Sequence, residues 1–300
     1  MKKTLIALAA VAVSSAAMAQ VTISGNVDAR YQSAKTSTAA ATKGFLINDA
    51  QLHFTANEDL GGGTTATARF TIDGATSDST ANDNTLVKGD GVFLSLANAQ
   101  LGSVTFSSVD ASDYLPMDLV TDSNLFNGTV DDRVTYTSPS ISGLRFIATM
   151  QEGNVGAGKS ATNQSKIYEI DYSAGPLTLN AGMLSVDKNT HTAFDGGTRV
   201  RVGYNFGVAA VSYGMINTKD KDGVKDKTTA LSVSVPMGAI TLGYAYGTHK
   251  DGAAAKIDGS AFSASYALSK RTSLIAEQVN YETSSFSSAK RTRITARHAF

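Results

Sequence analysis

The chain has 300 residues, and its 26 basic side chains equal its 26 acidic ones. This balance argues against a nucleic-acid-binding protein, which would carry a strongly basic face. The chain has no cysteine, which excludes a disulfide framework and leaves hydrogen bonding and packing to stabilise the fold. Its 27 glycines and only 4 prolines suit either a β-barrel or a secreted β protein.

The N-terminus has the pattern of a secretory signal peptide. Lys2 and Lys3 form a basic start, residues 5–13 an apolar run, and residues 17–19 a small-x-small cleavage site. The alternative is a membrane anchor, but the apolar run is too short to span about 30 Å of hydrocarbon. We therefore expect residues 1–19 to be a signal peptide and residues 20–300 to form one mature domain.

Alternation of apolar and polar residues runs through most of the mature chain. In residues 21–31, every second residue is apolar or glycine, and the residues between them, including Asp28 and Arg30, are polar. Residues 65–72 and 240–246 repeat this pattern. A period of two predicts β-strands that lie between an apolar and a polar environment, and no long amphipathic helix is expected.

The last strand of the series, residues 291–300, has the strongest contrast between its faces. One face carries Ile294, Ala296 and Phe300, and the other carries Arg291, Arg293 and Arg297. Such a strand suits a wall between lipid and water.

The connections between these strands differ in length. Turn-forming residues mark seven short connections and polar stretches mark eight long ones, which together join sixteen strands. The short connections are expected at residues 57–61, 97–102, 138–142, 173–176, 205–207, 235–238 and 268–271, and the long ones near 32–44, 74–89, 109–130, 151–165, 186–196, 217–226, 248–258 and 282–289. The expected fold is an all-β, transmembrane antiparallel barrel of about sixteen strands, which is wide enough for an aqueous channel.

Several motifs make the chain resemble the general porins of Gram-negative bacteria, most closely the β-proteobacterial (neisserial-type) trimeric porins. The motifs are VTISGNVD at 21–28, NEDLGGG at 57–63, RVTYTSP at 133–139, YNFGVA at 204–209, YALSKRT at 266–272 and RHAF at 297–300. The resemblance implies a homotrimer in the outer membrane whose third long loop folds inward and narrows the pore. It also implies that Phe300 belongs to a signal read by the barrel-assembly machinery, and that membrane lipid and lipopolysaccharide surround the barrel.

Charged residues give the candidate functional site. Acidic residues of the third loop and its end are candidates for the pore constriction: Asp110, Asp113, Asp118, Asp122, Asp131 and Asp132. Arginines expected on the water-facing side of strands are candidates for the opposite wall: Arg30, Arg69, Arg133, Arg145, Arg199, Arg201, Arg291, Arg293 and Arg297. Opposed rows of charge would orient dipolar solutes and tune ion selectivity. The alternative is that these charges only solvate the wall or pair locally.

The chain also departs from the porin pattern. It has Gln51 and Thr55 where related porins often carry basic residues, Thr129 where they often carry arginine, and Ser107 and Ser108 where their fifth strand ends in Gly-Arg. The resemblance therefore does not imply a strongly anion-selective constriction.

Aromatic residues near strand ends are candidates for membrane-interface girdles. They are Tyr31, Phe70, Phe106, Tyr136, Tyr172, Tyr204, Tyr213, Tyr266 and Phe300.

The expected function is passive diffusion of small hydrophilic solutes and ions through an outer-membrane channel, with no cofactor and no metal. An outer-membrane hydrolase is a rival, but His53, His191, His249 and His298 match no nucleophile or metal motif. Two further rivals are a structural or adhesive barrel and a secreted β-rich binding protein.

Overall fold

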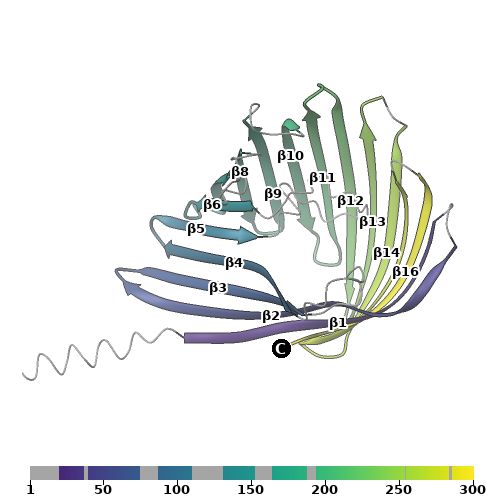
Figure 1. Ribbon diagram of the computed structural model, residues 1–300, viewed down its shortest axis with the longest axis horizontal. Helices are drawn as coiled ribbons and strands as arrows, with labels where there is room; N and C mark the ends of the chain where they lie inside the picture. The colour runs from purple at the N-terminus through teal and green to yellow at the C-terminus, as the bar shows by residue number, and fades with distance from the viewer. Residues whose placement is uncertain are drawn as a thin grey trace, which may run out of the picture.

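A computed structural model describes residues 20–36, 40–74, 87–109, 131–152, 164–187, 194–253, 255–283 and 286–300. These residues form sixteen strands that close into one barrel, each paired antiparallel with its neighbours in the sequence (Figure 1). The strands are β1 (Gln20–Thr36), β2 (Thr42–Gly61), β3 (Thr64–Gly74), β4 (Val87–Asn98), β5 (Gly102–Val109), β6 (Asp131–Thr137), β7 (Leu144–Glu152), β8 (Ser165–Ala174), β9 (Leu177–Val186), β10 (Phe194–Asn205), β11 (Ala210–Asp220), β12 (Lys225–Met237), β13 (Ile240–Asp251), β14 (Ile257–Ala267), β15 (Thr272–Thr283) and β16 (Phe286–Ala299). The predicted sixteen-stranded antiparallel barrel is confirmed.

The period-two pattern determines which side of the wall each residue faces. On β1, Val21, Ile23 and Val27 are exposed on the outside of the barrel, whereas Asp28 is fully buried on the inside. Residues directly opposite each other on neighbouring strands face the same side of the wall. The register therefore shows, strand by strand around the barrel, which residues face the lumen and which face outward. No helix among the described residues has the length and apolarity needed to cross a bilayer.

A small group of inward residues breaks the pattern of a polar lining. These apolar side chains are buried on the inner face, mostly between β8 and β15: Ile167, Leu184, Ile216, Ala230 and Val279. The apolar surface of the barrel otherwise lies on the outside, which is the reverse of a water-soluble protein.

The short connections lie at or beside the predicted positions, except that β2 includes the residues predicted as the first one, 57–61, and turns at residues 62–63. The β8–β9 turn, for example, consists of Gly175 and Pro176. At Gly102, which opens β5, φ is +87°, and an added Cβ would lie 2.2 Å from the carbonyl oxygen of Thr137. Only glycine fits there, because the strand starts in a left-handed conformation against the backbone of β6.

The connections at the other end of the barrel differ from the prediction. Residues 217–226 were expected to be a loop, but β11 continues to Asp220, β12 begins at Lys225, and Asn217 pairs with Lys227. The same holds at the β13–β14 connection, where β13 continues to Asp251. Polar residues that extend past the hydrocarbon can continue the hydrogen-bond ladder with water on both faces, so polarity alone does not end a strand here.

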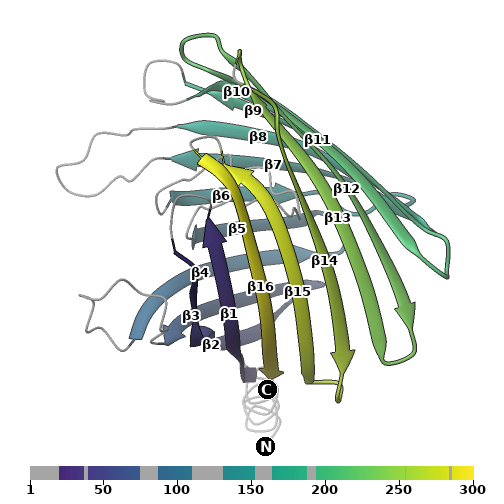
Figure 2. The ribbon, with the colours of Figure 1, turned by 90° about the vertical axis from the view of Figure 1, so that its right-hand side faces the viewer.

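Pairing of the first and last strands closes the barrel, and it brings the C-terminal residue onto β1 (Figure 2). The amide of Gly25 donates to the carbonyl oxygen of Phe300 at 3.0 Å, and the amide of Phe300 donates to Gly25 at 3.0 Å. A Cβ at Gly25 would lie 2.7 Å from Cζ of Phe300 and 2.3 Å from the carbonyl oxygen of Gln51. Glycine at this position therefore lets the terminal aromatic ring pack directly on the wall.

The predicted girdle aromatics all lie on outward rows. Most of them are well exposed, and Tyr31 and Tyr172 are half-buried. Other outward aromatics were not predicted: Phe45, Phe146, Tyr168, Phe206, Tyr244, Tyr246 and Phe262. Phe45 is the most exposed of the large apolar residues, and its ring lies 5.0 Å from the ring of Tyr31.

Candidate functional site: the lumen wall

The predicted wall arginines all lie on inward rows, and they come from six different strands. They are Arg30, Arg69, Arg133, Arg145, Arg199, Arg201, Arg291, Arg293 and Arg297. The period-two prediction of their orientation agrees with the register. What they do there depends on their neighbours.

One cluster lies on the wall formed by β8, β9 and β10. The guanidinium of Arg199 on β10 donates from Nε to Oδ1 of Asn180 at 2.9 Å and forms an ion pair with Glu169 on β8. Gly182 is the residue of β9 that pairs with both Arg199 and Glu169. Because glycine has no side chain, the guanidinium can cross the intervening strand to the carboxylate. Only 5% of the Arg199 side chain is exposed, against 17% for Glu169, so the pair is largely desolvated.

The next level of the same wall repeats the alternation of charge. Arg145 on β7 is opposite Asp171 on β8, Asp171 is opposite Asn180, and Asn180 is opposite Arg201. The Asn180 amide donates to both Asp171 and Glu169, which joins the two levels. Carboxylates are thus interleaved with guanidinium groups across four strands.

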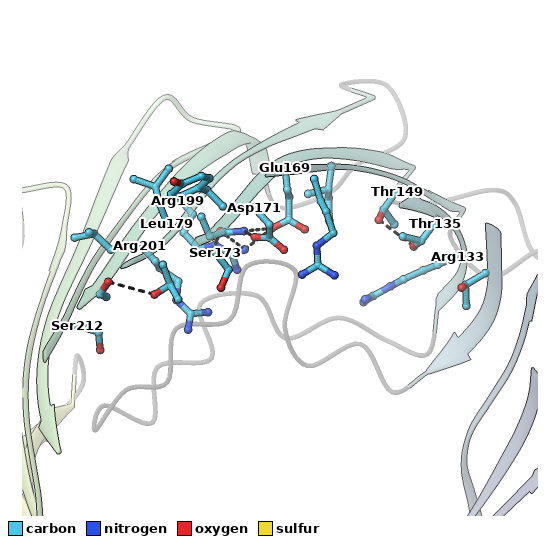
Figure 3. A pocket seen from close by; sticks show the side chains of 18 of the residues that line it. Arg133, Thr135, Thr149, Glu169, Asp171, Ser173, Leu179, Arg199, Arg201 and Ser212 are labelled. Atoms are coloured by element: carbon cyan, nitrogen blue, oxygen red, sulfur yellow. Dashed lines mark hydrogen bonds and ion pairs between the residues drawn. The ribbon is translucent and has the colours of Figure 1, made fainter. Parts of the chain in front are cut away.

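This wall borders a recess of about 840 Å³ on the lumen side. Figure 3 shows Arg133 on one side of Glu169 and Asp171, and Arg201 on the other. Hydroxyl groups lie between the charges, including Thr135, whose Oγ1 lies 3.0 Å from Oγ1 of Thr149. The recess offers both hydrogen-bond donors and acceptors to a polar solute.

A second cluster lies on the wall formed by β16, β1 and β2. Arg297 on β16 makes a bidentate contact with Asp28, from Nε to Oδ1 at 2.8 Å and from Nη2 to Oδ2 at 2.5 Å. Asp28 has no exposed surface, whereas half of the Arg297 side chain is exposed. The amide of Asn26 donates to the neighbouring Asp49 at 2.8 Å.

Other arginines of this second wall bond neutral groups. Arg30 donates from Nε to Thr295 at 3.1 Å and from Nη1 to Asn48. Arg293 donates to Gln32 at 3.1 Å and is paired in the register with Glu277. Rigid guanidinium groups thus lie within a network of carboxylates and amides here too.

The two clusters lie on opposite sides of the ring, since β1 and β9 are separated by about half of the sixteen strands. Both combine positive and negative groups, which differs from the predicted division into an arginine wall and an acidic loop. The inward carboxylates were missed as site residues: Asp28, Asp49, Asp73, Glu169, Asp171, Asp226, Asp251 and Glu277. The sequence held part of the signal, because Asp28 lies on the same period-two row as Arg30, and Asp73 on the same row as Arg69.

Only two of the six predicted constriction acids lie among the described residues. Asp110, Asp113, Asp118 and Asp122 lie outside the described residues, as does the segment expected to fold inward. Asp131 begins β6, and its backbone pairs with that of Val109. Asp132 shares the outward row of Val134 and Tyr136, so its assignment to the lumen is corrected. The period of two changes the side with each step along the chain, and two adjacent aspartates of one strand cannot both face the pore.

Gln51 and Thr55 lie on the inward row of β2, as the departure from the porin pattern requires. Gln51 is opposite Asp73, and Thr55 is opposite Arg69. Two of the positions where related porins often carry a basic group therefore present neutral side chains to the lumen.

A third charged group lies at the mouth of the barrel farthest from the C-terminus. Asp226 on β12 is directly opposite Asp251 on β13, and both face inward. Burial raises the pKa of Asp226 to about 6, and a hydrogen bond and the charge of Asp251 add to this effect. Nδ1 of nearby His249 lies 2.9 Å from Oγ1 of Thr228.

The described histidines share one structural arrangement. Nδ1 of His53 lies 3.1 Å from Thr71 Oγ1, and Nδ1 of His298 lies 2.9 Å from Thr272 Oγ1. Each of these threonines is the direct cross-strand partner of its histidine, as Thr228 is for His249. His191 lies outside the described residues. In the part of the chain that is described, no group of three or more His, Asp or Glu side chains could hold a metal ion.

Comparison with known proteins agrees with this architecture. The model of the Gram-negative porin family matches residues 4–285. No match to a curated protein was found.

Solved porin structures are similar in fold. The anion-selective porin from Comamonas acidovorans is 18% identical with a TM-score of 0.71, and the alignment covers 94% of this chain and 100% of that one. Salmonella typhi OmpF, solved in complex with daunomycin, is 14% identical with a TM-score of 0.74, covering 94% and 98%. A variant of the Rh. blastica porin is 12% identical with a TM-score of 0.69, covering 94% and 100%.

The family match extends over nearly the whole chain, and the closed barrel has an apolar exterior and a charged, hydroxyl-rich lining. The chain belongs to the Gram-negative porin family and is a channel protein of the outer membrane.

Proposed function

We propose that this porin lets small hydrophilic solutes and ions diffuse passively and that it selects only weakly by charge. The observation that carries the proposal is the mixed lining: guanidinium and carboxylate groups alternate on both opposed walls. Local pairing cancels much of the field that each arginine would project into the lumen. A solute is then selected mainly by size and by its ability to hydrogen-bond to the wall.

The narrowest part of the pore belongs to this proposal. Asp110, Asp113, Asp118 and Asp122 would lie in the constriction if the third long connection folds inward, as the resemblance to general porins implies. Their carboxylates would face the arginines of the wall. Asp131, which begins β6, would belong to the same acidic group.

The neisserial-type subfamily, a homotrimeric assembly and contacts with lipopolysaccharide are further parts of the proposal. They rest on the sequence motifs, which recur in order along the chain. Removal of residues 1–19 as a signal peptide is proposed on the basic, apolar and small-residue pattern. A role for Phe300 in recognition by the barrel-assembly machinery is supported by its position at the seam between β16 and β1.

A catalytic role is not part of the proposal. The cross-strand threonines that bond His53, His249 and His298 give these side chains a structural explanation. A hydrolase would need one of them, or His191, beside a nucleophile.

Swelling of proteoliposomes in uncharged sugars tests passive diffusion directly. Vesicles that contain the refolded porin should swell at rates that fall steadily as the sugar becomes larger. An absence of swelling with every sugar would favour the structural or adhesive barrel. A hydrolase would instead show esterase activity that is lost on substitution of a single serine.

A further inference from the structure

Among the strand residues whose side chains are described, arginines and lysines lie on opposite sides of the barrel wall. The strand arginines described above face the lumen, whereas every strand lysine whose side chain is described faces outward. These lysines are Lys35, Lys43, Lys166, Lys219, Lys225, Lys227, Lys250 and Lys290. All of them lie in the half of the barrel away from the short turns. Outer-membrane barrels have short periplasmic turns, so this half is the extracellular one.

Four of the outward lysines gather on β11, β12 and β13. Lys219 is directly opposite Lys225, and Lys227 is directly opposite Lys250. All four are exposed. Like charges at directly opposite positions of a sheet repel one another, so this lysine cluster is unfavourable unless an anion binds to it.

Acidic residues relieve this repulsion only in part. Lys219 forms an ion pair with Asp195 at 2.9 Å, and Asp258 on β14 lies on the outward row opposite Thr248. The aspartates that alternate with the lysines along the strands, Asp220, Asp226 and Asp251, point to the other side of the wall. The same strands are therefore positive outside and negative inside.

The lysine cluster lies immediately beyond the apolar band of the barrel. Toward the short turns, the next outward residues of β12 and β13 are Thr229 and Thr248, whose hydroxyl groups lie 2.8 Å apart. The outward residues after these are Leu231 and Tyr246, which are exposed on the outer surface. The lysines are thus at the level where lipid head groups meet the hydrocarbon. The strand ends that carry them lie at the opposite end of the barrel from the C-terminus (Figure 1).

We propose that Lys219, Lys225, Lys227 and Lys250 bind the phosphate groups of a lipid of the outer leaflet, whose acyl chains lie along the apolar band below. The site rests on the lipopolysaccharide contact proposed above and gives that contact a location. Lysine suits this role because its charge sits on a flexible stem that can reach up to a head group while the stem covers apolar surface. The arginines in the lumen have the opposite role, since their rigid planar groups are held by carboxylates.

Binding of purified lipopolysaccharide to the refolded porin in neutral detergent tests this site. The variant Lys227→Gln/Lys250→Gln removes the directly opposed pair, and it should weaken binding about 30-fold, since each lysine near a lipid head group contributes a factor of about five. Lys227→Arg/Lys250→Arg should retain most of the binding. The matched control, Lys270→Gln/Arg271→Gln, removes two exposed charges at the short-turn end and should bind like the unmodified protein.

A second arm uses the same lipid after chemical removal of its phosphates. This probe should bind the unmodified porin at least as weakly as the intact lipid binds K227Q/K250Q, because it loses the contacts of all four lysines. Equal binding of the two lipids, or unchanged binding by K227Q/K250Q, would overturn the proposal. So would a change of oligomeric state in K227Q/K250Q with lipid binding unchanged, which would assign the lysine cluster to a protein contact.

Two results separate this site from the broader function. Failure of the unmodified porin to bind intact lipopolysaccharide would overturn the lipid contact as a whole, whereas unchanged binding by K227Q/K250Q would overturn only its location. Single-channel conductance, which depends on the lumen, checks separately that each variant forms a barrel.

Discussion

Arg199 is almost fully buried although it lies on a row that faces the lumen. Its guanidinium is held by Glu169 and Asn180, which it reaches across Gly182. A buried ion pair of this kind adds little net stability over an apolar pair, but loss of one partner leaves an uncompensated charge. Arg199 therefore shapes the wall more than it attracts anions, which separates its role from that of an exposed arginine such as Arg145.

Substitution of Glu169 tests this assignment. Glu169→Gln should lower the free energy of unfolding by about 3 kcal/mol, because the Arg199 charge stays buried without its ion-pair partner. Denaturant unfolding followed by circular dichroism measures the change. Glu58→Gln, at an exposed outward position on β2, is the control and should stay within about 0.5 kcal/mol. The double variant Glu169→Gln/Arg199→Met should recover most of the loss, and a double variant as unstable as Glu169→Gln would contradict the assignment.

At the residue scale, the sequence predicted which side of the wall an arginine faces, but not which carboxylate it pairs with. The period of two placed Arg199 and Arg297 on the inward side, and the register agrees. Their partners Glu169 and Asp28 were not identified, because pairing across strands depends on register, which alternation within one strand does not determine. Asp132 was assigned to the lumen because it follows the third loop closely in sequence. The alternation of sides along a strand, which places it outside, was given too little weight.

At the scale of the element, the barrel depends on the seam between β1 and β16. Phe300 exchanges two backbone hydrogen bonds with Gly25 and places its ring against that glycine. The sequence predicted Phe300 as an outward terminal aromatic. It did not predict the close approach to Gly25, since this requires the register of two strands that are farthest apart in the chain.

Gly25→Ala tests the packing at the seam. The added Cβ would meet the Phe300 ring and the Gln51 carbonyl oxygen, so the variant should lose about 1–3 kcal/mol of stability and refold in lower yield. The fraction of folded barrel, measured by electrophoretic mobility without boiling, gives the yield. Gly44→Ala on β2 is the matched control, because a Cβ there meets nothing within 4 Å. Equal yields for the two variants would show that the seam tolerates the extra atom.

The β12–β13 hairpin should make ion selection depend on pH. The pKa of Asp226 is raised to about 6, so its carboxylate is charged above this pH and neutral below it. The pair with Asp251 loses negative charge at the extracellular mouth on acidification. His249 and Asp220 are the other titratable groups on the neighbouring inward rows. Cation permeability relative to anion permeability should therefore fall between about pH 7.5 and about pH 5. Zero-current potentials at several pH values measure this ratio. Asp226→Asn should remove the transition, and a transition that persists in this variant would assign it to another group.

At the scale of the whole molecule, the sixteen strands, their antiparallel order and the positions of most short turns followed from alternation and turn residues. The lengths of the extracellular strand extensions did not. Beyond the hydrocarbon a strand no longer needs an apolar side, so its pattern resembles that of a loop, as at Lys225 and Asp251. The distribution of charge is also a property of the whole barrel: arginines with carboxylates inside, and lysines outside at one end.

Planar-bilayer recording of the refolded porin tests the central claim most directly. A water-filled channel whose charged groups are paired along both walls predicts discrete conductance steps. It also predicts a zero-current potential under a salt gradient that stays well below the limiting value for either ion. Absence of conductance steps would contradict the channel, and a potential at the limiting value for one ion would contradict the balanced lining.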